Sequence, residues 1–486
     1  MDTVSPMSHS DADRRPVLVG VGTCHDHVDP TELLVRAALA AAVDAGSARL
    51  LAQVEEIAIP RGTWAAKNPG AVVAQRVGAP LARTVIADVG VPQQTLVSRA
   101  LSAIRDGSIS VALVLGAEAR AWSAAQRRAG LTDDQPDGDR APDVVLTPGR
   151  VIVSDAEIAA RFWDPVQQYA TIDQALLYAE GGTVGEIDEL WDRFNRVAGD
   201  NPLAAFPERR DAAALRSATS DNRPLAAPYR KWHSTQWNVD QAAALLLCSA
   251  AAARAAGVDP QRLVHPVVAL ESSFLATLPE RRHMHRWPAM EVLGAAATRA
   301  LAGRGPHTIE HVELYSCFPA AVRTQQRALG LPFDGTPTIT GGMAFAGGPF
   351  NNFTYQATAA MVQRLRADRG SLGMLTTVSG LLTKPGLMVW SATPPEELVI
   401  ANLEHEAAEV TETVELATAY DGPATVVAAT AVYAGDDPSE AIVIADTADG
   451  RRCVARSDDP AVAAAADALQ LIGARVTVAG PSFRHR

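Results

Sequence analysis

The stretch Ile339–Phe353, ITGGMAFAGGPFNNF, decides how this chain is interpreted. It holds four glycines, a proline and two asparagines between a strand-like segment, TPTIT (336–340), and a helix-like segment, TYQATAAMVQRLRA (354–367). Glycine lets the backbone approach a neighbour closely. Yet the stretch contains no His, Cys, Asp, Glu or Lys. We therefore expect a strand–turn–helix cradle that supplies no acid, base or nucleophile of its own.

Segments that alternate between strand and helix surround this cradle. PVLVGVGT (16–23) is a continuous apolar run, which is typical of a strand buried on both faces. In the next segment Asp29 can cap a helix, Pro30 fits its first turn and Gly46 ends it. The same order of elements recurs after residue 261. The pattern predicts a duplicated α/β unit with parallel sheets covered by helices.

Three regions follow from changes in this pattern. Residues 16–260 form a first half, interrupted at about 120–236 by an insertion that is rich in tryptophan and too apolar to be disordered. Residues 261–400 form a second half. Residues 410–486 read as three or four strands, a helix and a last strand, which is the order of an OB-like barrel.

The composition narrows the class of partner. The formal charge of -12 argues against nucleic acid or an anionic membrane as the main partner. The four cysteines have no metal-binding spacing, so no metal site is predicted, and free thiols suit a reducing compartment. The first 15 residues, MDTVSPMSHSDADRR, lack the apolar core of a signal peptide. These features together predict a cytoplasmic protein.

Three motifs carry a family resemblance: GAEA (116–119), which closes a strand, the block VELYSCF (312–318), and the glycines of the cradle before a late helix. With the duplicated unit and the insertion, they resemble the thiolase superfamily over Pro16–Ser391. The VELYSCF block and the extra terminal barrel make the chain similar to thiolase-like proteins related to the sterol-carrier-protein type of thiolase. The resemblance implies an α/β fold with a duplicated core of two βαβαβαββ halves and an additional OB-like domain.

The resemblance also implies where thiolase catalysis would occur. Thiolases use a Cys at a helix N-terminus, a His in a GHP motif, an Asn in a NEAF motif and a second Cys. Spacing from Gly107 and Glu118 places the first Cys position at Gly90, and the GHP motif places the His position at Gly348. No Cys occurs between Phe318 and Arg452. Ordinary thiolysis or Claisen condensation is therefore not expected, because a thiolate and its base are both missing.

Two side chains in the NEAF-like block are the candidate catalytic residues. The hydroxyl of Tyr315 could donate to an oxyanion or enolate, and Cys317 could be a substitute nucleophile. The alternative is that Cys317 is a small buried hydrophobe.

The candidate ligand-binding residues come from the cradle and from the end of the insertion. They are Gly341, Gly342, Gly347, Gly348, Asn351, Asn352 and His233. The alternative for the cradle is that its glycines only serve a tight turn and an asparagine caps the helix. A basic loop with Arg281, Arg282 and Arg286 lies where the resemblance implies bound ligand, and a solvated loop is its alternative.

The favoured function is a thiolase-like acyl-CoA-binding protein, or an acyltransferase that lacks the usual Cys and His. CoA or acyl-CoA is the expected ligand, and no covalently bound cofactor is expected. Two alternatives stay open: an aldolase-like C–C lyase on a CoA thioester, with Tyr315 stabilising an enolate, and a non-catalytic CoA or lipid carrier or scaffold. Whether the chain is an enzyme, forms a homodimer or needs a partner subunit is also left open.

Overall fold

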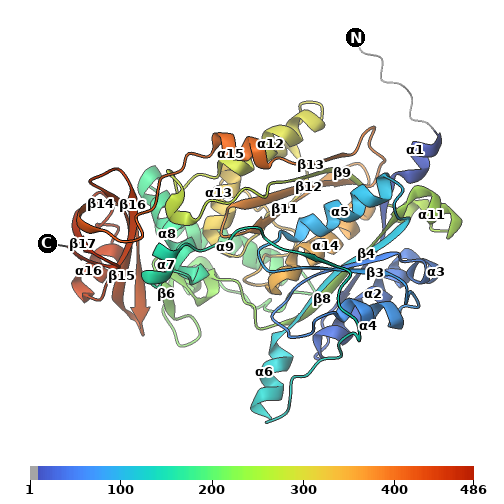
Figure 1. The fold of residues 1–486 in the computed structure, drawn as a ribbon, viewed down its shortest axis with the longest axis horizontal. Coiled ribbons are helices and arrows are strands. Elements are labelled where there is room, and N and C mark those ends of the chain that lie inside the picture. The colour runs from blue at the N-terminus through green and yellow to red at the C-terminus, as the bar shows by residue number, and fades with distance from the viewer. Residues whose placement is uncertain (1–8, 486) are drawn as a thin grey trace.

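The computed structural model describes residues 9–485 and contains three sheets (Figure 1). Of the N-terminal stretch 1–15, in which no signal peptide was predicted, the first eight residues lie outside the described residues. The strands of the first sheet are, in spatial order, β1 (Pro16–Cys24), β8 (Asp240–Ser249), β4 (Val111–Ala119), β2 (Glu56–Pro60), β3 (Arg83–Ala87) and β5 (Val144–Leu146). Those of the second are β10 (His311–Glu313), β11 (Leu372–Ser379), β12 (Lys384–Ser391), β9 (His265–Glu271) and β13 (Val399–Asn402).

The two sheets repeat one arrangement. In the first, β1, β8 and β4 are antiparallel neighbours and β4 runs parallel to β2. In the second, β9, β12 and β11 are antiparallel neighbours and β11 runs parallel to β10. The predicted duplication is confirmed. The predicted parallel sheets are wrong in one respect. The last strand of each half, β8 or β12, runs antiparallel to both of its neighbours, which are β1 and β4 in the first sheet and β9 and β11 in the second.

Two helices lie between the two sheets, α5 (Gln93–Arg105) and α14 (Phe353–Ala367) (Figure 1). Both contact strands of both sheets. Helices α2 (Pro30–Ala45), α4 (Pro69–Arg76) and α11 (Ala250–Ala255) pack on the first sheet, and α12 (Pro288–Ala300) packs on the second and against α13 (Pro319–Leu329). Strand β1 is buried on both faces: Val17 belongs to the cluster that contains α2, and Leu18 to the cluster that contains α5.

The segment TPTIT (336–340), predicted as a strand, is not one. The carboxylate of Glu313, at the end of β10, accepts hydrogen bonds from the backbone N–H groups of Ile339 (2.7 Å) and Thr340 (2.9 Å) and from the hydroxyls of Thr338 and Thr340 (3.0 Å). Backbone donors that bond a buried carboxylate cannot also form a strand ladder. The segment therefore wraps around Glu313 on its way into the cradle.

The C-terminal region forms the predicted barrel. Strands β14 (Asp421–Ala434), β15 (Asp437–Thr447), β16 (Arg452–Ser457), β18 (Ser482–His485) and β17 (Arg475–Ala479) close into a ring, because β14 pairs with both β15 and β17. Helix α16 (Pro460–Asp467) packs on it. The barrel lies at one end of the molecule, away from the first sheet (Figure 1).

The insertion connects the core to this barrel. Its hairpin of β6 (Pro224–Ala226) and β7 (Tyr229–Arg230) joins β14 in the same sheet. Its helices are α6 (Arg120–Arg128), α7 (Asp155–Ala159), α8 (Pro165–Glu180), α9 (Val184–Gly199) and α10 (Ala212–Arg216). Before the barrel, α15 (Glu404–Val410) packs on α12. Over residues 9–485, every helix is too short or too polar to cross a bilayer.

Candidate functional site

Gly90, the position that the resemblance assigns to the nucleophile, lies just before the N-terminus of α5. It is buried, and its φ of 99° lies in the left-handed region that favours glycine. A Cβ atom added there would lie 3.0 Å from Cβ of Pro148. The Gly90 carbonyl accepts hydrogen bonds from Lys384 Nζ and Ser379 Oγ, both at 3.1 Å. The position is thus enclosed by protein atoms.

Gly348, the position assigned to the catalytic His, is also enclosed. A Cβ atom there would lie 1.8 Å from Oγ1 of Thr235, so the fold leaves no room for a side chain. The Gly348 N–H donates to the carbonyl of Gln236 at 2.9 Å. Neither a side chain nor a free backbone donor is available at this position.

The first N–H groups of a helix have no acceptor within the helix, so the N-terminus of α14 could bind an oxyanion if they were free. Gln93 of α5, however, reaches across to it. Its Oε1 accepts from the Thr354 N–H at 2.9 Å, and its Nε2 donates to the Phe350 carbonyl at 3.3 Å. The amide of Gln93 therefore caps α14 from a neighbouring helix and takes the place that a ligand oxygen would need at Thr354.

Close packing accounts for the other glycines of the cradle. Gly341, Gly342 and Gly347 have φ of 94°, 74° and 104°. Added Cβ atoms would lie 2.4 Å from Ala198 Cβ, 2.6 Å from Phe194 Cδ1 and 2.5 Å from Gln241 Oε1, respectively. Their close approach is thus to α9 and β8. This agrees with the turn alternative, and a role in ligand binding stays a prediction.

The polar candidates also have protein partners. The amide nitrogens of Asn351 and Asn352 donate to the carbonyls of Arg61 (2.8 Å) and Gln241 (3.2 Å). His233 is fully buried, and burial lowers its pKa. Its Nδ1 accepts from the Arg230 N–H at 3.1 Å, and its Nε2 lies 2.9 Å from Asp188 Oδ1. Both ring nitrogens are therefore engaged within the protein.

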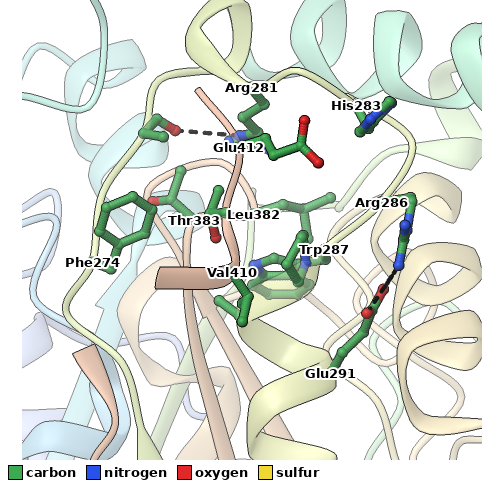
Figure 2. A pocket seen from close by; sticks show the side chains of 14 residues that line it. Phe274, Arg281, His283, Arg286, Trp287, Glu291, Leu382, Thr383, Val410 and Glu412 are labelled. Carbon is green, nitrogen blue, oxygen red and sulfur yellow. Dashed lines mark hydrogen bonds and ion pairs between the residues drawn. The ribbon is translucent and has the colours of Figure 1, made fainter. Parts of the chain in front are cut away.

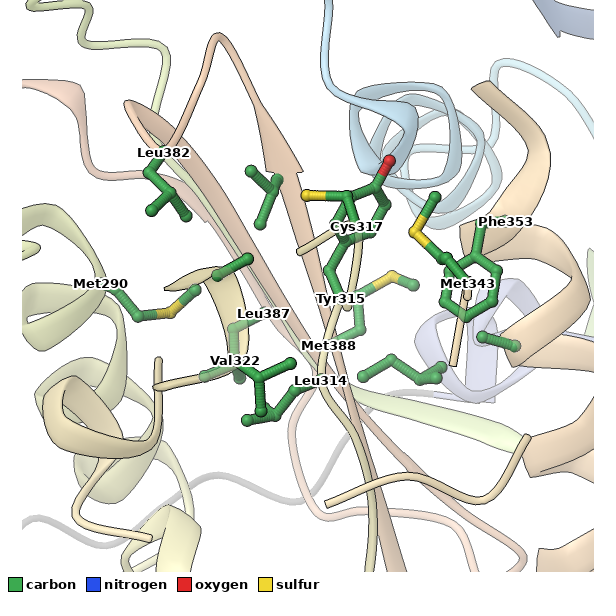
Figure 3. Packing of buried hydrophobic residues seen from close by; sticks show 14 of the residues in the cluster. Met290, Leu314, Tyr315, Cys317, Val322, Met343, Phe353, Leu382, Leu387 and Met388 are labelled. Carbon is green, nitrogen blue, oxygen red and sulfur yellow. The ribbon is translucent and has the colours of Figure 1, made fainter. Parts of the chain in front are cut away.

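Tyr315 and Cys317, the candidate catalytic residues, lie close together in a packed interior (Figure 3). They are 8% and 7% exposed. Burial raises the pKa of Cys317 to about 12, against a smaller lowering by a hydrogen bond from Tyr169. The sulfur is therefore a thiol at neutral pH, whereas the nucleophile of an acyl transfer is a thiolate. Burial also raises the pKa of Tyr315, whose ring packs edge-on against Phe353 at 5.9 Å.

A pocket opens beside the basic loop that contains Arg281 and Arg286 (Figure 2). Its volume is ≈ 190 Å³. It lies at the tip of the β11–β12 hairpin, between the basic loop before α12 and the chain that follows α15. Its lining includes Phe274, Ala276, Arg281, His283, Arg286, Trp287, Glu291, Leu382, Thr383, Val410 and Glu412.

Arg281 is the residue that gives this pocket its chemistry. Its side chain is 6% exposed, with Nε donating to the Ala276 carbonyl at 3.2 Å and Nη2 to the Leu381 carbonyl. Burial lowers its pKa to about 10, so it remains charged at neutral pH. Within residues 9–485, no carboxylate lies within 4.0 Å of this guanidinium. A buried charge of this kind is costly unless an anion or a strong acceptor pairs with it.

Other lining residues fit a ligand with a polar and an apolar end. The indole N–H of Trp287 is buried, and no described residue accepts a hydrogen bond from it. Arg286, nearer the outside, pairs with Glu291 at 3.1 Å (Figure 2). Of the basic loop proposed from the sequence, Arg281 and Arg286 thus line the pocket. Arg282 does not line it, and its backbone N–H donates to the Glu412 carbonyl at 3.0 Å.

The β11–β12 hairpin contacts both the pocket and Gly90. Leu382 and Thr383 line the pocket, while Ser379 and Lys384 bond the carbonyl of Gly90. Lys384 is 1% exposed, also donates to the Pro148 carbonyl at 3.0 Å, and has its pKa lowered by burial. Sequence reasoning missed it, although a lysine in the apolar run KPGLMVW was the available signal.

Comparison with solved structures agrees with this architecture. A monomeric SCP2-thiolase like protein type 1 from Mycobacterium smegmatis is similar with a TM-score of 0.83 and 26% sequence identity, over 98% of this chain and 99% of that one. The chain therefore has a thiolase-like fold with an additional C-terminal barrel. No protein-family model matches its sequence, and neither does any curated protein.

More distant structures share the fold of this thiolase-like protein. The Ltp2-ChsH2(DUF35) aldolase has a TM-score of 0.59 and 17% identity, over 80% of this chain and 100% of that one. The dimeric peroxisomal thiolase of Saccharomyces cerevisiae has a TM-score of 0.55 and 13% identity, over 78% and 97%. The predicted fold, a thiolase-like α/β core with a terminal barrel, is confirmed.

Proposed function

We propose that this thiolase-like protein binds a CoA thioester without passing the acyl group to a thiol of its own. One observation carries the proposal: the pocket holds the buried guanidinium of Arg281, which has no carboxylate within 4.0 Å among residues 9–485. A carbonyl or carboxylate oxygen of an acyl group would accept from this guanidinium. The carbon chain would lie against Phe274, Leu382 and Val410.

The enclosed catalytic positions support binding over acyl transfer. Gly90 and Gly348 have no side chain and no space for one, and Cys317 is a buried thiol with a raised pKa. Acyl transfer by the thiolase route needs a thiolate and a base, and these positions supply neither.

Isothermal titration with CoA, acetyl-CoA, succinyl-CoA and octanoyl-CoA tests this proposal. We expect at least one ester to bind, with no change in protein mass and no new small molecule. Arg281→Gln should weaken binding at least tenfold, whereas Arg282→Gln, which changes an exposed neighbour outside the pocket lining, should stay within twofold. Absence of binding by every ester, or an acyl adduct on the protein, would contradict the proposal.

A second variant keeps the test valid if Arg281→Gln does not fold. Val410 is 49% exposed on the pocket wall, so Val410→Trp fills the pocket without removing a buried hydrogen bond. It should weaken ester binding as strongly as the loss of Arg281. A preference for succinyl-CoA would place a carboxylate at Arg281, and a preference for octanoyl-CoA would place the thioester carbonyl there.

An aldolase-like lyase is the second candidate, favoured by the state of Tyr315. Its raised pKa keeps the hydroxyl protonated, so it can donate to an enolate oxygen. A structure similar in fold is an aldolase. A β-hydroxyacyl-CoA panel followed by mass spectrometry tests this candidate. Cleavage that is lost in Tyr315→Phe with ester affinity retained supports a lyase, and an unchanged panel excludes it.

A further inference from the structure

A second cleft lies where the insertion meets the barrel. Its volume is ≈ 270 Å³. Three parts of the chain form it: helices α8 and α9, the β6–β7 hairpin with α10, and the barrel with its helix α16. Its lining residues are Gln174, Leu177, Val184, Arg216, Pro224, Pro228, Tyr229, Arg230, Tyr433, Asp467 and Leu469. It shares no lining residue with the Arg281 pocket.

Arg230 is the unusual residue of this cleft. The atoms Nε and Nη1 of its side chain are buried, and neither finds a hydrogen-bond partner in the described structure. No ion pair within 4.0 Å involves Arg230 among the described residues. Its neighbour Arg216 differs, since it forms two hydrogen bonds of 2.8 Å with Asp188. Within residues 9–485, Arg230 therefore has two buried N–H donor atoms without an acceptor and no carboxylate within 4.0 Å.

The remaining polar groups do not pair with Arg230. Asp467, the acid in the lining, accepts a hydrogen bond of 2.5 Å from the hydroxyl of Tyr433. Gln174 is 1% exposed, and its Nε2 donates to the Ala227 carbonyl at 3.2 Å. Its Oε1 is buried, with no donor near it in the part of the chain that the structure describes. The cleft thus offers both unmet donors and an unmet acceptor.

We propose that this cleft binds a small organic anion whose carboxylate or phosphate oxygen accepts from Arg230. A half-buried guanidinium whose N–H groups have no acceptor destabilises the folded protein, because these groups have lost their hydrogen bonds to water. A charge-assisted hydrogen bond to a ligand oxyanion would offset this cost. Leu177, Val184 and Leu469 provide an apolar wall for the rest of the ligand. A hydroxyl on the ligand would satisfy Oε1 of Gln174 after a small side-chain shift.

The position of the cleft gives such a ligand a structural consequence. Arg230 belongs to the insertion, whereas Tyr433 and Asp467 belong to the barrel region. A bound anion would contact both sides and stabilise their association, because a ligand that binds only the assembled state shifts the equilibrium toward it. This inference does not depend on CoA binding at Arg281.

Two probes test the site: inorganic phosphate and benzoate, each titrated at constant ionic strength with sodium chloride as the reference salt. We measure the dissociation constant by calorimetry and the thermal unfolding midpoint. At least one probe should bind and raise the midpoint. Binding of phosphate alone indicates a phosphoryl ligand, and binding of benzoate indicates a carboxylate ligand.

Matched variants locate the binding. Arg230→Met should weaken the probe that binds at least tenfold, whereas Arg475→Met, on an exposed position of β17, should stay within twofold. Val184→Phe narrows the cleft without changing its charge, and should weaken binding even if Arg230→Met fails to fold. If neither probe binds, or if both cleft variants bind as the unmodified chain does, the cleft holds only water and the inference is wrong.

Discussion

Thr235 occupies the space that a side chain at position 348 would need, since a Cβ atom on Gly348 would lie 1.8 Å from Thr235 Oγ1. Thr235 lies at the end of the insertion, and its backbone N–H donates to the Cys317 carbonyl at 2.9 Å. A residue of the insertion thus fills the space beside Gly348. A His introduced at position 348 alone would therefore not fit.

Gly348→Ala tests this packing directly. We expect a loss of ~1–3 kcal/mol in the free energy of unfolding, the usual cost of overpacking. Urea unfolding measures it. Thr235→Gly in the same chain should recover part of the loss, and Gly370→Ala, where an added Cβ meets nothing within 4 Å, should change little. Equal stability of the Gly348 and Gly370 variants would contradict the packing.

Cys317 should be unreactive in the folded protein. Its pKa of about 12 leaves almost no thiolate at pH 8, and the sulfur is buried. Iodoacetamide should therefore label it only after unfolding, as judged by peptide mass spectrometry of native and urea-treated samples. Cys317→Ser identifies the peptide in the unfolded sample. Rapid labelling of the native protein would instead show a reactive thiol.

The titration of Glu271 should lower the free energy of unfolding as the pH rises from about 4.5 to about 7. Burial raises the pKa of Glu271 from 4.5 to about 7, so the folded state holds its proton more tightly than the unfolded state does. The folded state therefore loses stability as this proton leaves, and the loss levels off above pH 7. The same direction applies to Glu118 and Glu313.

The variant Glu271→Gln measures how much Glu271 contributes to the pH dependence of the free energy of unfolding. Thr95 Oγ1 donates to Glu271 at 2.7 Å, and a glutamine keeps an acceptor there. With ~1.4 kcal/mol for each pKa unit, the shift from 4.5 to about 7 corresponds to roughly 3–4 kcal/mol in full, of which about 2 kcal/mol falls between pH 5 and pH 7.5. Urea unfolding at pH 5 and pH 7.5 should give a flatter profile for Glu271→Gln, and an unchanged one for the exposed control Glu396→Gln. An unchanged slope in Glu271→Gln would place the titration elsewhere.

Arg452 should hold the barrel to the second half of the core. It is 1% exposed, with Nε donating to Asp446 at 2.7 Å and Nη1 to the carbonyls of Pro279 and Arg281. Arg452→Met leaves these acceptors unpaired and should cost ~1–3 kcal/mol. Limited proteolysis should then cut sooner between residues 411 and 420. The adjacent Arg451→Met, whose guanidinium pairs with Asp449 in the same loop, should change neither measurement.

Local sequence patterns were enough for most of the architecture. The cap at Asp29 and the left-handed Gly46 bound α2 where expected, and periodicity revealed the duplicated halves and the barrel. The antiparallel last strand of each half was missed, because an apolar run reads the same in either direction. The strand expected at 336–340 failed because Glu313, distant in sequence, takes its backbone donors.

By itself, the sequence determined which chemistry is missing. The resemblance assigns the thiolase Cys and His positions to Gly90 and Gly348, and no Cys occurs between Phe318 and Arg452. These residue types can be read without coordinates. Only the tertiary structure decided what surrounds these positions: Thr235 against Gly348, Gln93 capping α14, and Arg281 buried with no carboxylate within 4.0 Å among residues 9–485. Space, burial and charge pairing depend on residues that meet across the fold, and no local pattern records them.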